Sequence, residues 1–139
     1  MKSLLGKLGV ILIGLASFSY VEVWGAEWKF YTESENEKFF CDVESITKPS
    51  KNIVKVWVKM EYTDRGVNEM VKELGKKYEN ISYTKSLEEI NCSDNKSRTL
   101  SLNDYSKEGK IIFGSNRENE WEYIVPESVT DTLRKAVCK

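Results

Sequence analysis

The amino-acid sequence predicts an α+β fold: an antiparallel sheet of about six strands with a C-terminal helix packed on one face, and a second short helix between strands. Residues 53–62 alternate between apolar and polar side chains, which is typical of an antiparallel strand with one solvated face. Two other segments place their apolar residues at helical spacing. Most strand-like segments are joined by turns too short for a parallel crossover, so the sheet is expected to be antiparallel.

Strand signals recur along the chain and are separated by polar turns. The clearest strand is 53–62, whose valines lie on one face. Trp57 departs from this pattern, because its position places it on the face of Lys55 and Lys59. A turn is expected at 49–52, which contains a proline and an asparagine. The other segments in which strands are expected are 27–32, 38–43, 81–92, 97–105, 110–113 and 121–125.

Two segments have the period of an amphipathic helix. In the first, Asp64 is expected to cap the start and Gly75 to end the helix. Its apolar stripe consists of Val67, Met70, Val71 and Leu74. The second helix follows Pro126, where Ser128 and Asp131 have the spacing of a capping box. Its apolar stripe consists of Val129, Leu133, Ala136 and Val137.

The N-terminal quarter has the pattern of a signal peptide. A short segment with two lysines precedes an uninterrupted apolar run at 8–18. That run is too short for a transmembrane helix, which needs about 20 residues. We expect residues 1–25 to be a signal peptide cleaved after Gly25, leaving one domain over 26–139 with no membrane span. The location is then periplasmic, secreted or cell-surface associated. The alternative is an uncleaved N-terminal anchor.

Composition narrows the function. The chain has 21 Lys and Arg against 22 Asp and Glu, interspersed throughout, so no basic patch for nucleic acid is expected. It has no histidine, which removes the commonest general base and the usual metal ligand. No catalytic residue, metal site or cofactor is therefore expected, and the protein is predicted not to be an enzyme.

Two acidic groups are the remaining candidates for chemistry. One is the pair Glu88 and Glu89. The other is Glu118, Glu120 and Glu122, which would share one side of a strand and there hold a cation or a glycan hydroxyl. A solvated acidic rim is the favoured interpretation, because acidic side chains are mostly exposed. The alternative is a glycan hydrolase, which needs two carboxyl groups about 5–9 Å apart.

The predicted domain contains three cysteines, Cys41, Cys92 and Cys138. Export to an oxidising compartment favours one disulfide and leaves one thiol over, with three possible pairings. We favour Cys92–Cys138, because it would tether a C-terminal helix that could otherwise fray. For Cys41 a buried position in the core is favoured, and an intermolecular disulfide is the alternative.

A possible binding surface consists of Trp57 together with Lys55 and Lys59. An exposed tryptophan beside lysines has the character of an interface anchor. The alternative is that a helix or loop covers Trp57, since tryptophan is usually largely buried.

Several segments between residues 27 and 138 carry a family resemblance through their order and spacing. They are Glu27-Trp28, Phe39-Phe40-Cys41-Asp42, Ser45-Ile46, Val54 to Lys59, Ser86 to Cys92, and Trp121 to Cys138. In this combination the chain resembles the surface-adhesin protein E family of exported bacterial proteins. The resemblance implies an antiparallel sheet whose C-terminal helix is tethered by a disulfide.

The resemblance also implies a function in binding host extracellular-matrix or serum proteins, and a possible homodimer. Two features depart from the family pattern. Cys41 stands where similar proteins tend to carry an aromatic residue, and no cysteine lies at the predicted cleavage point to carry a lipid. We therefore expect an exported non-enzymatic binding protein. The alternative is a periplasmic accessory protein of an envelope complex with no adhesive role.

Overall fold

The computed structural model describes residues 26–139. The predicted signal peptide, residues 1–25, lies outside this range. The α+β class is confirmed, and residues 26–139 contain a larger sheet than expected: eight strands, with two α-helices and a short 3-10 helix. In chain order the elements are β1 (Trp28–Glu33), β2 (Glu37–Asp42), β3 (Thr47–Ser50), β4 (Ile53–Tyr62), α3 (Asp64–Leu74), η2 (Lys76–Tyr78), β5 (Ile81–Asn91), β6 (Lys96–Ser106), β7 (Ile111–Ser115), β8 (Glu122–Tyr123) and α4 (Val129–Val137).

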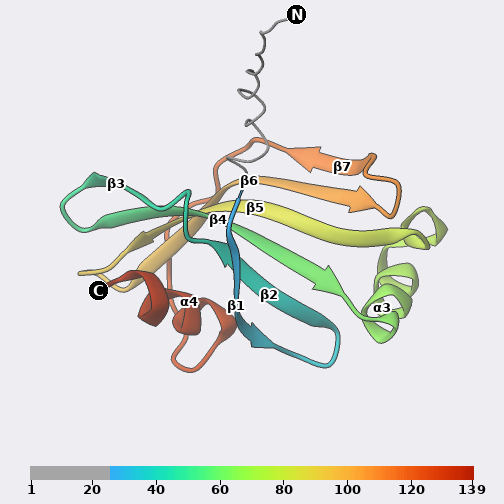
Figure 1. Ribbon diagram of the computed structural model, residues 1–139, viewed down its shortest axis with the longest axis horizontal. Helices are drawn as coiled ribbons and strands as arrows, with labels where there is room; N and C mark the ends of the chain where they lie inside the picture. The colour runs from blue at the N-terminus through green and yellow to red at the C-terminus, as the bar shows by residue number, and fades with distance from the viewer. Residues whose placement is uncertain (1–25) are drawn as a thin grey trace, which may run out of the picture.

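The strands form one antiparallel sheet in the order β1-β2-β4-β5-β6-β7, and β3 and β8 add short pairings to β4 and β6. The long strands β4 and β5 lie at its centre (Figure 1). Every described pairing is antiparallel, as expected from the short turns. The helix α3 lies at the end of the sheet away from the C-terminus, while α4 lies beside β1 and β2 (Figure 1).

The core lies between α4 and one face of the sheet. Alternation along β4 directs its three valines to this face, and Ile90 lies opposite Val54 on β5. Leu133 and Val137 from α4 complete the contact. Val56 and Ile90 are fully buried, and removing each such side chain from water contributes about 1.5–3 kcal/mol. The expected packing of the C-terminal helix on one face of the sheet is confirmed.

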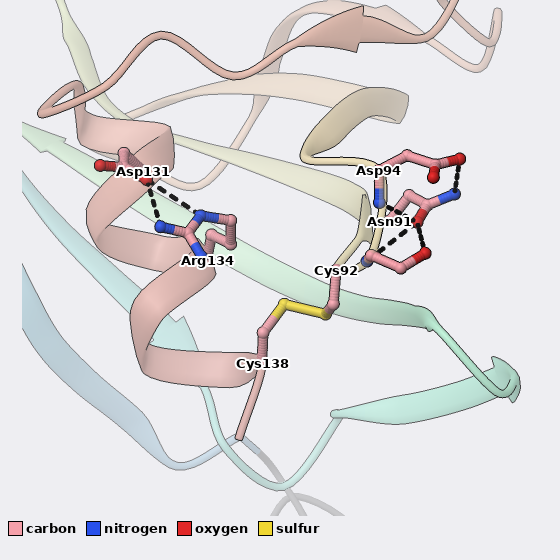
Figure 2. Close-up of a disulfide and its surroundings, with 7 residues drawn as sticks. Asn91, Cys92, Asp94, Asp131, Arg134 and Cys138 are labelled. Carbon is pink, nitrogen blue, oxygen red and sulfur yellow. Dashed lines mark hydrogen bonds and ion pairs between the residues drawn. A yellow bond between two sulfur atoms is a disulfide. The ribbon is translucent and has the colours of Figure 1, made fainter.

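Both ends of α4 are fixed by side-chain bonds. At the start, the Ser128 hydroxyl accepts a hydrogen bond of 3.1 Å from the Asp131 backbone N–H, and the Asp131 carboxylate pairs with Arg134 at 2.8 Å. At the other end, Cys138 caps the helix and forms the expected disulfide with Cys92, their Cα atoms 5.8 Å apart (Figure 2). The disulfide holds the end of α4 next to the end of β5.

Cys41 is buried, with 4% of its surface exposed, and is a free thiol. It belongs to the core cluster under α4. Burial raises the pKa of the thiol, which keeps it in the unreactive protonated form. The buried position favoured from the sequence is confirmed.

Three local predictions were wrong. The first helix is capped by Thr63, whose hydroxyl accepts from the Gly66 N–H at 3.1 Å, and Asp64 is instead the first helical residue. The expected turn at 49–52 begins too early, because Thr47–Ser50 pairs with β4 as strand β3. The predicted strand at 121–125 shortens to β8, and Glu118 and Glu120 lie in the loop before it, so they do not share a strand face with Glu122. The end of α3 at Leu74 before Gly75 is as expected.

A chain of buried hydroxyls joins the sheet to the segment after α3. Thr84 donates a hydrogen bond of 2.6 Å to the Asp104 carboxylate, and Tyr78 donates one of 3.3 Å to its other oxygen. The Tyr62 and Thr84 hydroxyls lie 2.8 Å apart. Burial raises the pKa of the Tyr62 hydroxyl to about 12.

None of the described helices is both long enough and apolar enough to span a membrane.

Candidate functional site

The structure places Trp57, Lys55 and Lys59 on the face of the sheet opposite α4, which we call the open face. They occupy the positions of β4 that alternate with its buried valines. The helix α4 packs on the other face, and Tyr78 after α3 bonds to Asp104 on that other face as well. Trp57 is accordingly only partly buried, and no described helix covers it.

Two lysines of the open face lie over aromatic rings. The Nζ of Lys59 is 5.0 Å from the centre of the Trp28 ring and 5.5 Å from that of Phe40. The Nζ of Lys85 on β5 is 5.8 Å from the Trp28 ring and 5.7 Å from the Tyr105 ring. Each such contact contributes about 0.5–1 kcal/mol at an exposed site. The lysines therefore hold rings from β1, β2 and β6 together, and we call this set the aromatic–lysine cluster.

The cluster extends across neighbouring strands through ring-to-ring contacts. Tyr83 and Tyr105 lie opposite each other on β5 and β6 and stack at 4.8 Å. Phe30 and Phe40 pair on β1 and β2 with their rings edge to face at 5.8 Å. Each such ring pair contributes about 0.5–1.5 kcal/mol beyond the apolar area that it buries. A rigid aromatic surface loses little conformational entropy when a partner covers it.

The three sequence-predicted residues differ in their availability. Lys59 forms an ion pair of 3.2 Å with Glu61 and exposes only 19% of its side chain. Lys55 lies opposite Glu89, but that carboxylate is bound by Arg98 at 2.9 Å. Within residues 26–139, Lys55 forms no ion pair and stays available for an anionic group of a partner.

A shallow hollow of about 300 Å³ lies on the open face between Trp28, Trp57 and Tyr105, with Lys85 and Asp42 at its margin. One oxygen of the buried Asp42 carboxylate, Oδ1, accepts from the backbone N–H groups of Glu27 at 2.9 Å and of Glu44 at 3.0 Å. The hollow thus offers aromatic walls and one cation. It suits an apolar side chain next to a carboxylate.

The sequence prediction missed six members of this surface: Trp28, Phe30, Phe40, Tyr83, Lys85 and Tyr105. Each lies in a segment that was predicted as a strand. The register between strands decides which of these side chains lie on the same face of the sheet, and the sequence pattern does not show that register. The sequence signal that could have identified this surface is the occurrence of aromatic residues and lysines on the same side of a strand.

The acidic candidates are divided between the two faces of the sheet and a loop. Glu88 and Glu89 are adjacent in β5 and point to opposite faces of the sheet. Arg98 binds both Glu89 and Glu118, at 2.9 Å and 3.4 Å. Across residues 26–139, no three acidic or cysteine side chains gather as a metal site would require. Glu118 and Glu89 thus belong to a structural ion-pair network.

Comparison with known proteins agrees with this architecture. The family model described as Surface-adhesin protein E matches residues 28–139, which include every strand and helix described within residues 26–139. No curated protein and no solved structure matches the chain. Membership of this family implies an exported or cell-surface protein that binds other proteins. The match covers most of the sequence, and the chain belongs to the surface-adhesin protein E family.

Proposed function

We propose that this chain is an exported, non-enzymatic protein that binds a protein partner through its open face. In this proposal, cleavage after Gly25 releases a domain of residues 26–139, and the partner is a host extracellular-matrix or serum protein. The observation that carries the proposal is the aromatic–lysine cluster on a face that α3 and α4 leave uncovered. Family membership supports the same kind of function.

The chemistry of the cluster suits a protein partner. Tryptophan and tyrosine dominate binding energy at interfaces, because they bury a large area and have few rotamers to fix. Trp57 borders the hollow, where a partner side chain would contact its ring. Lys55 and Lys85 would then meet carboxylates of the partner at the rim and speed association.

The substitution Trp57→Ala tests this proposal. Binding to a panel of immobilised purified matrix and serum proteins is measured by surface plasmon resonance. We expect Trp57→Ala to weaken binding about 30-fold, as for loss of an interface anchor worth about 2 kcal/mol. Phe113→Ala is the matched control, since Phe113 is 46% exposed on the helix-bearing face. Equal weakening by both variants, or by neither, would contradict the proposal.

Localisation distinguishes the adhesin from the alternative of a periplasmic accessory protein. Antibody against the described domain is applied to intact cells, and parallel samples are subjected to osmotic shock. Labelling of intact cells is the expected result. Release by osmotic shock without surface labelling would replace the adhesive function with the accessory one.

The family resemblance also leads us to propose a homodimer. Within residues 26–139, the outer edges of β1 and β7 have no neighbouring strand, so either could pair with a second copy. Cys41 is buried, so such a dimer would not depend on its thiol. Light scattering after size-exclusion chromatography should give the mass of two chains, unchanged by reductant, whereas the mass of one chain would refute the dimer.

A further inference from the structure

A second candidate site lies on the other side of the sheet, in a cavity of about 180 Å³ between the sheet and α4. Its apolar wall includes Val58 and Met60 from β4 and Leu133 from α4. Its polar wall includes Tyr31, Glu88 and Thr99, which come from three different strands. The cavity therefore combines an apolar wall with a carboxyl group and the hydroxyl groups of Tyr31 and Thr99, and Ser86 and Thr130 add further hydroxyls to its lining.

Two irregularities in the sheet converge on this cavity. The register of β1 and β2 shifts between Phe30 and Thr32, which leaves Tyr31 as an extra residue. The register of β5 and β6 shifts after Leu87, so that Thr99 lies opposite Glu88. Such bulges redirect side chains and are over-represented next to functional sites. Two separate bulges each bring a hydroxyl group to the same cavity, which is not expected of a simple packing defect.

Glu88 is a carboxyl group without a cationic partner. Both of its oxygens lie 3.0 Å from the Thr99 hydroxyl, which has only one hydrogen to donate. Burial raises the pKa of Glu88, partly offset by hydrogen bonds from Ser86 and Thr99. No ion pair to Glu88 forms within the described chain, whereas its neighbour Glu89 is bound by Arg98 at 2.9 Å. Glu88 is only partly buried, but a carboxylate that has lost part of its hydration without gaining a cation is unfavourable, and a ligand that supplied a cation would be favoured.

The Tyr31 hydroxyl faces the same charge. Burial raises the pKa of Tyr31, with smaller contributions from the charges of Cys41 and then Glu88, so this hydroxyl stays protonated. No hydrogen bond to the Tyr31 hydroxyl is formed by residues 26–139. Its oxygen is therefore free to accept a hydrogen bond from a ligand next to Glu88.

We propose that this cavity binds a primary ammonium group on a short alkyl chain. The ammonium would donate to Glu88, Tyr31 and Thr99, and the methylene groups would lie against Met60 and Leu133. An ammonium fits better than a guanidinium, because its three donors diverge and the three acceptors come from different strands. The same chemistry is carried by a lysine side chain of a partner protein and by a free alkylamine.

The test uses the full 139-residue chain labelled with ¹³C at its methyl groups. n-Butylammonium chloride is titrated, with n-butanol as the neutral ligand of equal length. We expect saturable shifts of the Val58, Met60 and Leu133 methyl signals with n-butylammonium, and binding of n-butanol at least about tenfold weaker. Equal binding of the two ligands, or shifts confined to other methyl groups, would overturn the proposal.

Variants locate the charge that matters. Glu88→Gln should weaken n-butylammonium binding at least about tenfold, and Tyr31→Phe should weaken it less. Glu122→Gln is the control, because it removes the same charge from an exposed strand. Unchanged affinity in Glu88→Gln would refute the site. If Glu88→Gln does not fold, two other measurements test the site. They are the comparison of n-butylammonium with n-butanol on the unsubstituted protein, and the affinity of Tyr31→Phe for n-butylammonium.

A further ligand distinguishes the two sources of the ammonium. Nα-acetyl-lysine N-methylamide presents the same group on a peptide-like backbone. Binding as tight as that of n-butylammonium supports docking of a partner's lysine. Binding of n-butylammonium alone supports a free amine as the ligand.

Discussion

Removing the disulfide between Cys92 and Cys138 should lower the free energy of unfolding by about 4 kcal/mol. The two residues are separated by 46 positions, and closing a loop of this length restricts the unfolded chain by about that amount in the chain-entropy model. A domain of this size has a total stability of about 5–15 kcal/mol, so the loss is a large fraction. The double variant Cys92→Ser/Cys138→Ser makes the change without leaving a reactive thiol.

The loss should be largest at α4. This helix has nine residues, and a helix shorter than about 12 residues is marginal without tertiary contacts. Without the disulfide, the buried side chains that hold α4 on the sheet are those of Leu133 and Val137. Hydrogen exchange of the α4 amides should accordingly increase more than that of the β4 and β5 amides.

Urea unfolding of residues 26–139 measures the effect. With a slope of about 1.5 kcal/mol per M, the midpoint of the double variant should fall by about 2–3 M. The unsubstituted protein in reductant should reach the same midpoint, and reductant should leave the double variant unchanged. A fall of less than about 0.5 M would refute the argument that the disulfide supplies a large share of the stability.

Three further predictions concern the helices and the buried hydroxyl chain. The pKa of Asp131 is lowered to about 2, first of all by the hydrogen bond that its carboxylate accepts from the Glu127 backbone N–H. Its contribution to stability is therefore present above pH 4 and is lost as the pH falls toward 2. The difference in melting temperature between the unsubstituted protein and Asp131→Asn should thus be large at pH 7 and small at pH 2. Gly66→Ala should destabilise the domain by about 1–3 kcal/mol in urea, because its Cβ would collide with the carbonyl oxygen of Asn36, and no loss would contradict the close approach of α3. Thr84→Val removes the 2.6 Å hydrogen bond to buried Asp104 and should cost about 1.5–3 kcal/mol, whereas an unchanged unfolding midpoint would show that the chain of hydroxyls is not stabilising.

The sequence was sufficient for the fold class because its strongest signals reflect burial. Strict alternation along 53–62 distinguishes the core face of β4 from its open face, and the helical stripe ending at Val137 identifies the face of α4 that packs on the core. The disulfide followed from the position of Cys138 at the end of that helix. These features depend on local pattern, so sequence alone contains them.

The parts that were missed depend on neighbours. β3, which contains Pro49, has four exposed residues and no alternation, and it is a strand only because β4 lies beside it. The bulge at Tyr31 changes which residues of β1 share a face, and no residue pattern marks it. The aromatic–lysine cluster needs Trp28 and Lys85 to lie near Lys59, which depends on the register of several strands.

Footprinting of lysine side chains in the presence of a bound partner tests most directly whether the open face is the binding surface. Reductive methylation followed by mass spectrometry compares each lysine in the free and bound protein. Lys55 and Lys85 should lose reactivity on binding, while Lys135, which is 63% exposed on α4, should keep it. Protection of Lys135 with unchanged Lys55 and Lys85 would place the partner on the helix-bearing face and contradict the proposed function.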